Sequence, residues 1–242
     1  MYTCHTSFLL LLQFVSYMLP GQVSITGKYG VIHKIVHFYD EYGNPTFTDV
    51  LRIWYKDSAV IEEIHRINTV TVGDSTTVTY PLILCRYIHL RTKTYYDYKT
   101  FSDTAKIFNK AVLPDSQMRD YGWSFYSDKV LRIKGIPESL SDTVIDNITY
   151  KRVKFSFERH DPKKHFVVGY LRCDGRGELF SMEKQYSRER NCTMVKFFDF
   201  EYGREKPYAS QEIEFVSDTL TKEEVKIFDV WEQNARQNPI NK

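Results

Sequence analysis

Histidine and aspartate residues gather at one predicted hairpin and could form a metal site. His160 and His165 flank the segment that begins at Asp161, and their imidazoles would face each other across the mouth of the hairpin. Directly opposed strand residues have Cβ atoms about 4.5–5.5 Å apart, so both rings and Asp161 could hold a metal ion for hydrolysis. A tetrahedral site usually has three or four protein ligands, however. We favour a polar turn with two exposed rings, and expect no metal, no cofactor and no catalytic residue.

Other pairs of reactive side chains have unsuitable spacing for shared chemistry. His33 and His37 lie four residues apart in a predicted strand, which separates them by about 13 Å along one face, too far to share a metal. Glu62 and Glu63 are adjacent and point to opposite faces, so they cannot flank one substrate atom. The common catalytic strings GxGxxG, GxSxG, HExxH and CxxC are missing. These patterns favour a protein that is not an enzyme, with a metal-dependent hydrolase as the alternative.

Aromatic side chains provide the best candidate for binding. They make up 15% of the chain, and several surround its least regular part. Large rings usually form cores because they bury so much area, but they also line pockets for apolar ligands. We predict a ligand site on the concave face of a curved sheet, beside the connection from Ser102 to Tyr121. Its candidate residues are Tyr96, Tyr98, Trp123 and Phe125.

Apolar and polar side chains alternate along most of the chain, so most of it is expected to form strands. These strands position the candidate residues. From Ile148 to Tyr202 the sequence reads as four strands, ITYKRVKFSFER, HFVVGYLRC, LFSMEKQYS and CTMVKFFDFEY, joined by polar turns. Val153, Phe155 and Phe157 alternate with polar residues, a period-2 pattern typical of a strand with one buried face. We predict that this stretch is the centre of an antiparallel sheet.

The rest of the chain contains further strands and one helix. Strands are predicted over residues 23–39, 47–55, 59–67, 69–80, 82–90, 93–98 and 122–134, with a hairpin turn at 73–75. Residues 102–121 and 136–146 are predicted connections. Residues 221–238 form a helix, because Thr221 and Glu224 have capping-box spacing and Phe228 and Trp231 share an apolar face. The predicted fold is an all-β antiparallel meander, an open barrel or strongly curved sheet, with this helix packed on it.

The beginning of the sequence resembles a secretory signal peptide. An apolar run from Phe8 to Leu19 is followed by Pro20 and Gly21, and it is shorter than the roughly 20 residues of a membrane-spanning helix. We predict a signal over residues 1–21, one domain over residues 22–242, and a periplasmic or secreted protein without a transmembrane segment in its mature part. The alternative is a buried N-terminal helix.

An exported chain can form disulfides, and Cys85, Cys173 and Cys192 would remain after cleavage. If LFSMEKQYS is a strand between Cys173 and Cys192, the two cysteines lie far apart along the ladder. We therefore do not expect a bridge between them. A bridge from Cys85 to either cysteine stays open, as does the absence of any disulfide.

The charge balance indicates no particular partner. The net charge is +2 over 242 residues, with no run of like charges, so nucleic acid is not an expected partner. An apolar ligand, a peptide or another envelope protein remains a candidate. A third possibility is an interaction module that uses an exposed edge strand.

Several stretches resemble the GLPGLI family of exported Bacteroidota proteins and, more distantly, the open-barrel fold of periplasmic lipoprotein carriers. The resemblance is carried by LRIWYKDSAVIEE, IHLRTKTYYDYKTFSDT and NITYKRVKFSF. It implies an exported β-rich protein with an open barrel, and it assigns no catalytic residue. Together with the aromatic residues, it leads us to expect a non-enzymatic binding or envelope-associated protein.

Overall fold

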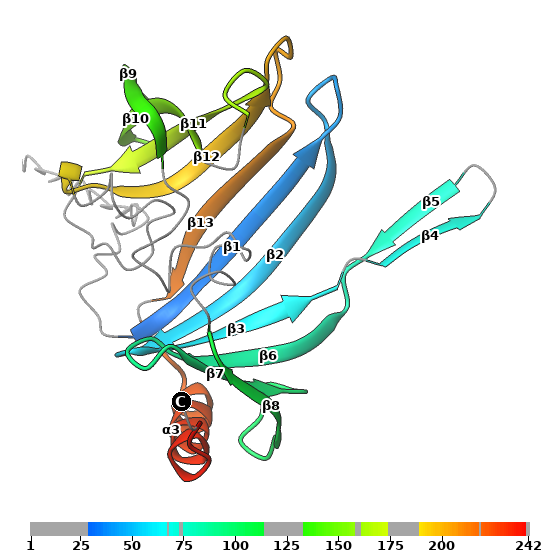
Figure 1. Ribbon diagram of the computed structural model, residues 1–242, viewed down its shortest axis with the longest axis vertical. Coiled ribbons are helices and arrows are strands. Elements are labelled where there is room, and N and C mark those ends of the chain that lie inside the picture. The colour runs from blue at the N-terminus through cyan, green and yellow to red at the C-terminus, as the bar shows by residue number, and fades with distance from the viewer. Residues whose placement is uncertain are drawn as a thin grey trace, which may run out of the picture.

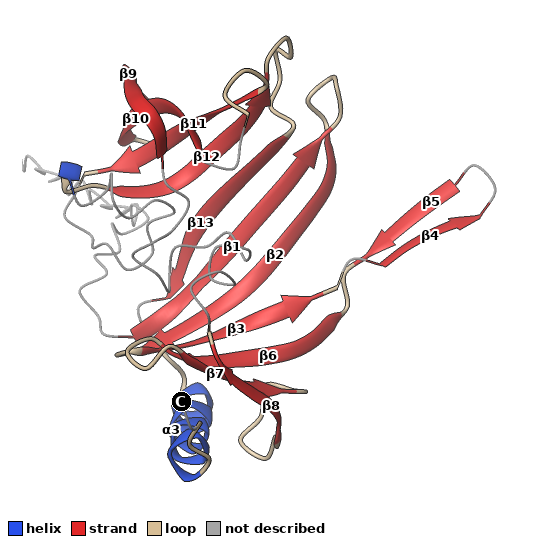
Figure 2. Cartoon of the chain, in the orientation of Figure 1, coloured by secondary structure: helices blue, strands red, loops and turns tan. Residues whose placement is uncertain are grey.

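The computed structural model describes residues 29–66, 68–72, 75–113, 133–157, 161–173, 189–217 and 219–240. The strands are β1 (Tyr29–Tyr39), β2 (Pro45–Lys56), β3 (Ala59–His65), β4 (Asn68–Val72), β5 (Ser75–Thr79), β6 (Leu82–His89), β7 (Thr94–Tyr98), β8 (Ile107–Val112), β9 (Ile133–Ile145), β10 (Ile148–Phe157), β11 (His165–Arg172), β12 (Thr193–Glu201) and β13 (Ala209–Ser217). Helix α3 (Lys222–Gln237) follows β13. The predicted all-β fold with a C-terminal helix is confirmed (Figure 2).

Eleven strands form one antiparallel sheet in the order β8-β7-β6-β3-β2-β1-β13-β12-β11-β10-β9, and β4 and β5 form a separate ribbon. Figure 1 shows the sheet strongly curved, with the ribbon projecting from it. The centre is β1, which pairs with β2 on one side and β13 on the other. The stretch Ile148–Tyr202, predicted as the centre, instead belongs to the arm formed by β9 to β12. Although consecutive among the described strands, β8 and β9 lie at opposite edges.

Tight turns occur where the residues permit unusual backbone angles. Asp146 and Asn147 have φ of 49° and 62° in the two-residue connection between β9 and β10. Positive φ at both positions suits the right-handed twist of a hairpin, and Asn and Asp tolerate it better than most residues. Between β1 and β2, the Asp40 carboxylate accepts the backbone N–H groups of Tyr42 and Asn44 at 2.9 and 2.8 Å. The turn after Tyr39 therefore has a local side-chain stabiliser.

Three parts of the sheet differ from the sequence-based prediction. The expected connections over residues 102–121 and 136–146 contain strands β8 and β9, and β13 was not predicted. β9 includes Gly135 at φ 76° and Pro137, which interrupt a strand pattern. The predicted strand LFSMEKQYS and most of residues 122–134 lie outside the described residues.

The two faces of the sheet carry separate apolar clusters. Residues paired across strands share a face, so Ile32 lies with Ile53 and Phe215 on one side. This concave-face cluster extends to Val153 and Val167 on the far arm. The opposite face, below β1 to β7, carries a second cluster that includes residues of α3. Figure 1 shows α3 outside the curve of the sheet.

Helix α3 is fixed to the sheet by its cap and its apolar face. The Thr221 side chain accepts the Glu224 N–H at 3.2 Å, and the Glu224 carboxylate accepts the Thr221 N–H at 2.7 Å, so the predicted capping box is confirmed. The other Glu224 oxygen accepts the indole N–H of Trp54 at 2.7 Å. Phe228 and Trp231 are buried against the sheet. One glutamate thus both caps the helix and binds it to β2.

A disulfide joins Cys173 to Cys192, contrary to the expectation that they lie far apart. The physical reason is the register: β11 pairs directly with β12, with Arg172 opposite Thr193, so the two cysteines are neighbours across the ladder. Cys85 is a free, fully buried thiol on the opposite arm. Burial, followed by the nearby Glu63 carboxylate, raises its pKa to about 12, which keeps it protonated and unreactive.

Candidate ligand-binding site

A pocket of about 320 Å³ lies between strands β6 and β7 and the C-terminal end of α3. The sheet contributes Tyr87 and Tyr96, which are paired across the two strands. The helix contributes Glu232 and Arg236, and Ile240 closes the wall beyond the helix. The volume is at the lower end of the range for small-molecule sites, and the lining combines aromatic rings with a few polar groups, as in many such sites.

The hydroxyl of Tyr87 is the unusual group of this pocket. The Tyr87 side chain is fully buried, and its oxygen has no hydrogen-bond partner among the described residues. Buried polar atoms nearly always have a partner, so an unpaired hydroxyl on a residue that lines a pocket is a candidate partner for a ligand or water. Burial, followed by the nearby Glu232 carboxylate, raises the pKa of Tyr87 above its ordinary value. The hydroxyl therefore remains protonated and can donate.

His89 supplies a second donor with a defined tautomer. Its Nδ1 accepts the backbone N–H of Thr92 at 3.2 Å. Burial lowers the pKa of His89, so the ring is neutral near pH 7. In a neutral imidazole one nitrogen accepts and the other carries the hydrogen, and the Nδ1 bond assigns that hydrogen to Nε2. His89 therefore adds an uncharged N–H donor to the pocket.

Tyr96 forms an aromatic wall of the pocket and ties the end of the helix to the sheet. Its hydroxyl donates to the carbonyl oxygen of Ala235 at 3.2 Å, and the carbonyl oxygen of Asn238 lies at 3.4 Å. At the rim, the Arg236 guanidinium donates to Glu232 at 2.6 Å, so their charges offset each other. The pocket consequently has an apolar interior, two uncharged donors and a nearly neutral rim.

Two of the four aromatic residues predicted for the site, Tyr96 and Tyr98, lie among the described residues, on the face of the sheet that α3 covers. Tyr96 lines the pocket, but it faces α3 and not the concave face of the sheet. Tyr98 is fully buried, with its ring stacked on Trp231 at 3.8 Å between centroids, so it is a packing residue. This corrects the expected position of both tyrosines. Trp123 and Phe125 lie outside the described residues.

The concave face carries charged residues as well as its apolar cluster. Arg86 donates to Asp97 at 2.7 and 3.1 Å, and its guanidinium lies over the Tyr95 ring at 4.1 Å. Farther along this face, burial lowers the pKa of Lys34 from 10.5 to about 7, against the opposing effect of the Glu62 and Asp49 carboxylates. These residues were not predicted as a group, because only the strand register brings them together.

Lys34 should make the stability of the protein depend on pH. The unfolded chain keeps the lysine proton up to about pH 10, whereas the folded chain releases it above about pH 7. The unfolded state binds more protons in that interval, so the free energy of unfolding should rise with pH, by at most about 1.4 kcal/mol per unit.

Urea unfolding from pH 7 to pH 9 tests this expectation by comparing the protein with Lys34→Met. The free energy of unfolding of the unsubstituted protein, relative to the variant, should increase over the interval. Lys206→Met, at an exposed lysine, controls for the loss of one positive charge. A difference that stays constant with pH would contradict the assignment.

The alternative hypothesis, a metal site at His160, Asp161 and His165, is not supported by its described members. The Asp161 carboxylate accepts the Lys163 N–H at 3.0 Å within a turn, and the His165 ring packs against Tyr208 with centroids 5.5 Å apart. His160 lies outside the described residues. Among the described residues no group of three or more His, Cys, Asp or Glu side chains could hold a metal ion.

The other histidines make separate polar contacts. His33 lies 3.4 Å from Glu214, and the His37 ring is 2.7 Å from the Thr48 hydroxyl. These contacts agree with the expected packing or solvated roles of the two rings.

Comparisons with family models and with curated proteins identify no relative of this chain. Within the described residues, no helix is both long and apolar enough to cross a membrane. No family model matches the chain, and no curated protein matches it.

Proposed function

We propose that this chain is an exported, non-enzymatic binding protein that holds a small apolar ligand or a peptide side chain bearing a hydrogen-bond acceptor. The site is the pocket between β6, β7 and α3. The observation that carries the proposal is the buried hydroxyl of Tyr87, which has no hydrogen-bond partner in the described part of the chain. An acceptor on the ligand would pair this hydroxyl, while the Tyr87 and Tyr96 rings contact its apolar part.

Two features support export. The apolar run from Phe8 to Leu19 has the length of a signal-peptide core. The Cys173–Cys192 disulfide is a bond that persists mainly in oxidising compartments. Both features agree with a periplasmic or secreted binding protein.

The interaction-module alternative would use an edge strand, and β9 is one candidate. Ile136 in this strand is 97% exposed. The next residue, Pro137, has no N–H to donate to an added strand, and proline on an edge is a common means of preventing strand pairing. We therefore favour the pocket over the edge.

Substitution of Tyr87 by phenylalanine should separate binding from stability. The change removes only the hydroxyl, so affinity for an acceptor-bearing ligand should fall about tenfold. The unliganded protein should become more stable by about 1 kcal/mol, because an unpaired buried hydroxyl is lost. Titration calorimetry with decanoate as the probe measures the first effect, and urea unfolding without decanoate measures the second.

Tyr42→Phe is the matched control, because Tyr42 is 75% exposed at the tip of the β1–β2 hairpin. It should change neither quantity. Native mass spectrometry of the protein purified gently from its own source should show a bound small molecule. A bare polypeptide mass together with no decanoate binding would overturn the proposal.

A further inference from the structure

Two segments of the sequence match the acceptor pattern for N-linked glycans, Asn-X-Ser/Thr with X other than proline. They are Asn147-Ile148-Thr149 and Asn191-Cys192-Thr193. The glycan transferase acts while an exported chain enters the secretory pathway, and the folded protein accommodates the bulky glycan at its surface. The local structure of each segment therefore determines whether a glycan fits there.

Asn147 lies in an exposed turn. It is the second residue of the two-residue connection between β9 and β10, and its φ is 62°. The side chains of Asn147 and Thr149 are both exposed, and neither makes a hydrogen bond with any residue that the structure describes. In this part of the chain, the amide that would receive the sugar and the hydroxyl that the transferase recognises are therefore both available.

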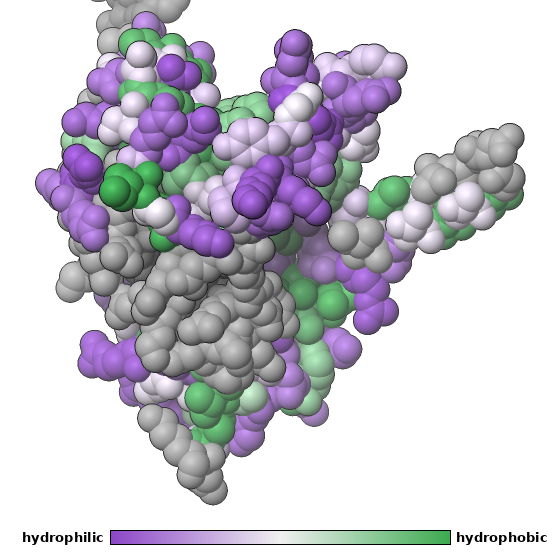
Figure 3. Space-filling view, turned by 45° about the horizontal axis from the view of Figure 1, so that its top comes forward, coloured by the Kyte–Doolittle hydropathy of each residue, from purple (hydrophilic) through white to green (hydrophobic). Residues whose placement is uncertain are grey.

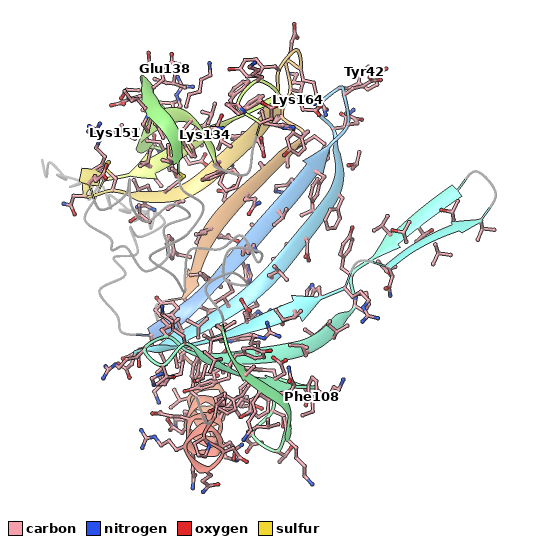
Figure 4. All side chains as sticks on the ribbon, in the orientation of Figure 1. Tyr42, Phe108, Lys134, Glu138, Lys151 and Lys164 are labelled. Carbon is pink, nitrogen blue, oxygen red and sulfur yellow. A yellow bond between two sulfur atoms is a disulfide. The ribbon has the colours of Figure 1, made fainter. Side chains whose placement is uncertain are left out.

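A hollow beside this turn gives room for the first sugar. Its volume is about 360 Å³, and its lining includes Asn147, Thr149 and Cys173. Figure 4 places Lys151, two residues beyond the acceptor segment, on the arm formed by β9 to β12. The hollow shares no lining residue with the pocket beside α3, so a glycan here would not occupy that pocket.

A glycan at Asn147 would also cover an exposed part of the sheet edge. β9 is the last strand of the large sheet, and Val144 and Ile145 are exposed at its end, just before the turn. In Figure 3 hydrophobic side chains lie among hydrophilic ones on the visible surface of this arm. Pro137 hinders strand addition in the first half of β9 only. A bulky polar group beside the other end would hinder it there, where exposed apolar residues favour pairing with another chain.

The second segment differs because two of its three residues are enclosed. Asn191 is exposed, but Cys192 and Thr193 are only 5% and 4% exposed, and Cys192 is bridged to Cys173. Cys173 precedes Cys192, so both partners of the bridge are present as soon as this segment has been made. Once the bridge has formed and Thr193 is buried, the transferase cannot bind the segment.

We propose that Asn147 carries an N-linked glycan in the exported protein, and that the disulfide excludes Asn191 from the same modification. The donor is an oligosaccharide joined through pyrophosphate to a polyisoprenol lipid. The amide nitrogen of Asn147 bonds to the anomeric carbon of the first sugar and loses one proton to a base of the transferase. The bond from that carbon to the pyrophosphate oxygen breaks, and the lipid pyrophosphate leaves with the electron pair. The inference rests on the export proposed above and narrows it to a secretory pathway that holds this transferase.

Peptide mass spectrometry of the protein purified from its own source tests the modification. A glycan-releasing amidase in heavy-oxygen water converts a glycosylated asparagine to a labelled aspartate. The label should appear at Asn147 and not at Asn191. An unlabelled Asn147 would overturn the inference, and equal labelling of both asparagines would overturn the exclusion of Asn191.

The N-terminal peptide in the same spectrum separates this inference from the proposed export. If residues 1–21 are absent and Asn147 is unlabelled, the glycan is excluded while export is supported. If residues 1–21 are present and Asn147 is unlabelled, both proposals are overturned.

Substitutions of Thr149 test the acceptor segment while leaving the turn residues unchanged. When the variants are secreted from cultured animal cells, Thr149→Ser keeps the hydroxyl and should stay glycosylated, whereas Thr149→Ala should lose the mass of the glycan. Loss from both variants, or from neither, would contradict the assignment. Decanoate binding beside α3 should be the same in both, because the two sites share no lining residue.

Cys173→Ser tests the role of the disulfide. It removes the bridge but leaves the Asn191-Cys192-Thr193 pattern intact, so Asn191 should become labelled in protein from the same cells. An unlabelled Asn191 in this variant would show that the disulfide is not what excludes it.

Discussion

Replacing Trp231 with alanine should lower the free energy of unfolding by about 3–5 kcal/mol, typical of a fully buried tryptophan. Trp231 is completely buried, stacks on Tyr98, and donates its indole N–H to the carbonyl oxygen of Ser102 at 3.0 Å. The substitution leaves a cavity between α3 and the sheet and an unpaired carbonyl. Guanidinium unfolding followed by circular dichroism at a β-sheet wavelength measures the loss without depending on tryptophan fluorescence.

Gln233→Ala is the matched control for this substitution. Gln233 lies in the same helix, two residues away, but its side chain is exposed. Its replacement should change the free energy of unfolding by no more than about 0.5 kcal/mol. If Trp231→Ala lowered the free energy of unfolding by no more than this control, α3 would not be part of the core.

Replacing both bridging cysteines, Cys173→Ser and Cys192→Ser, should cost about 3 kcal/mol of stability. The two residues are 19 apart in sequence, and a loop of this size restricts the unfolded chain by roughly that free energy. Urea unfolding without reductant measures the difference. Adding reductant to the unsubstituted protein should reproduce the loss and should leave the double variant unchanged.

A double variant as stable as the unsubstituted protein would show that the bridge does not form in solution. Cys85→Ala serves as a separate control, because it removes a buried thiol that forms no disulfide. Its effect on stability should not depend on reductant.

Much of the fold could be predicted from sequence because alternation is a local property. β10 alternates along Val153, Phe155 and Phe157, and these residues are buried while Arg152 and Lys154 are only partly so. The capping box and the turn at Asp40 are also local. β8 was missed because Phe108 and Val112, in this edge strand, remain exposed, so no buried face imposes a pattern. β9 was missed because Gly135 and Pro137 interrupt it.

Register could not be predicted in the same way, and the errors about the cysteines and tyrosines both follow from it. The distance between Cys173 and Cys192 depended on whether a strand separates β11 from β12, and these strands pair directly. Tyr96 and Tyr98 share a face because they are two residues apart, but the face covered by α3 is set by long-range packing. Tyr87 lines the pocket because the register of β6 and β7 places it opposite Tyr96.

The position of β1 at the centre of the sheet has a consequence for how fast the chain can fold. Read from β9 to β13 and then from β1 to β8, the large sheet is a simple meander, so a circularly permuted chain starting at β9 would pair its strands largely in sequence. The natural order instead joins β1 to β13, near opposite ends of the described chain. Pairing over such separation raises contact order and slows folding. During synthesis, the edge of β1 that pairs with β13 stays unpaired until β13, which comes late in the chain, has been made.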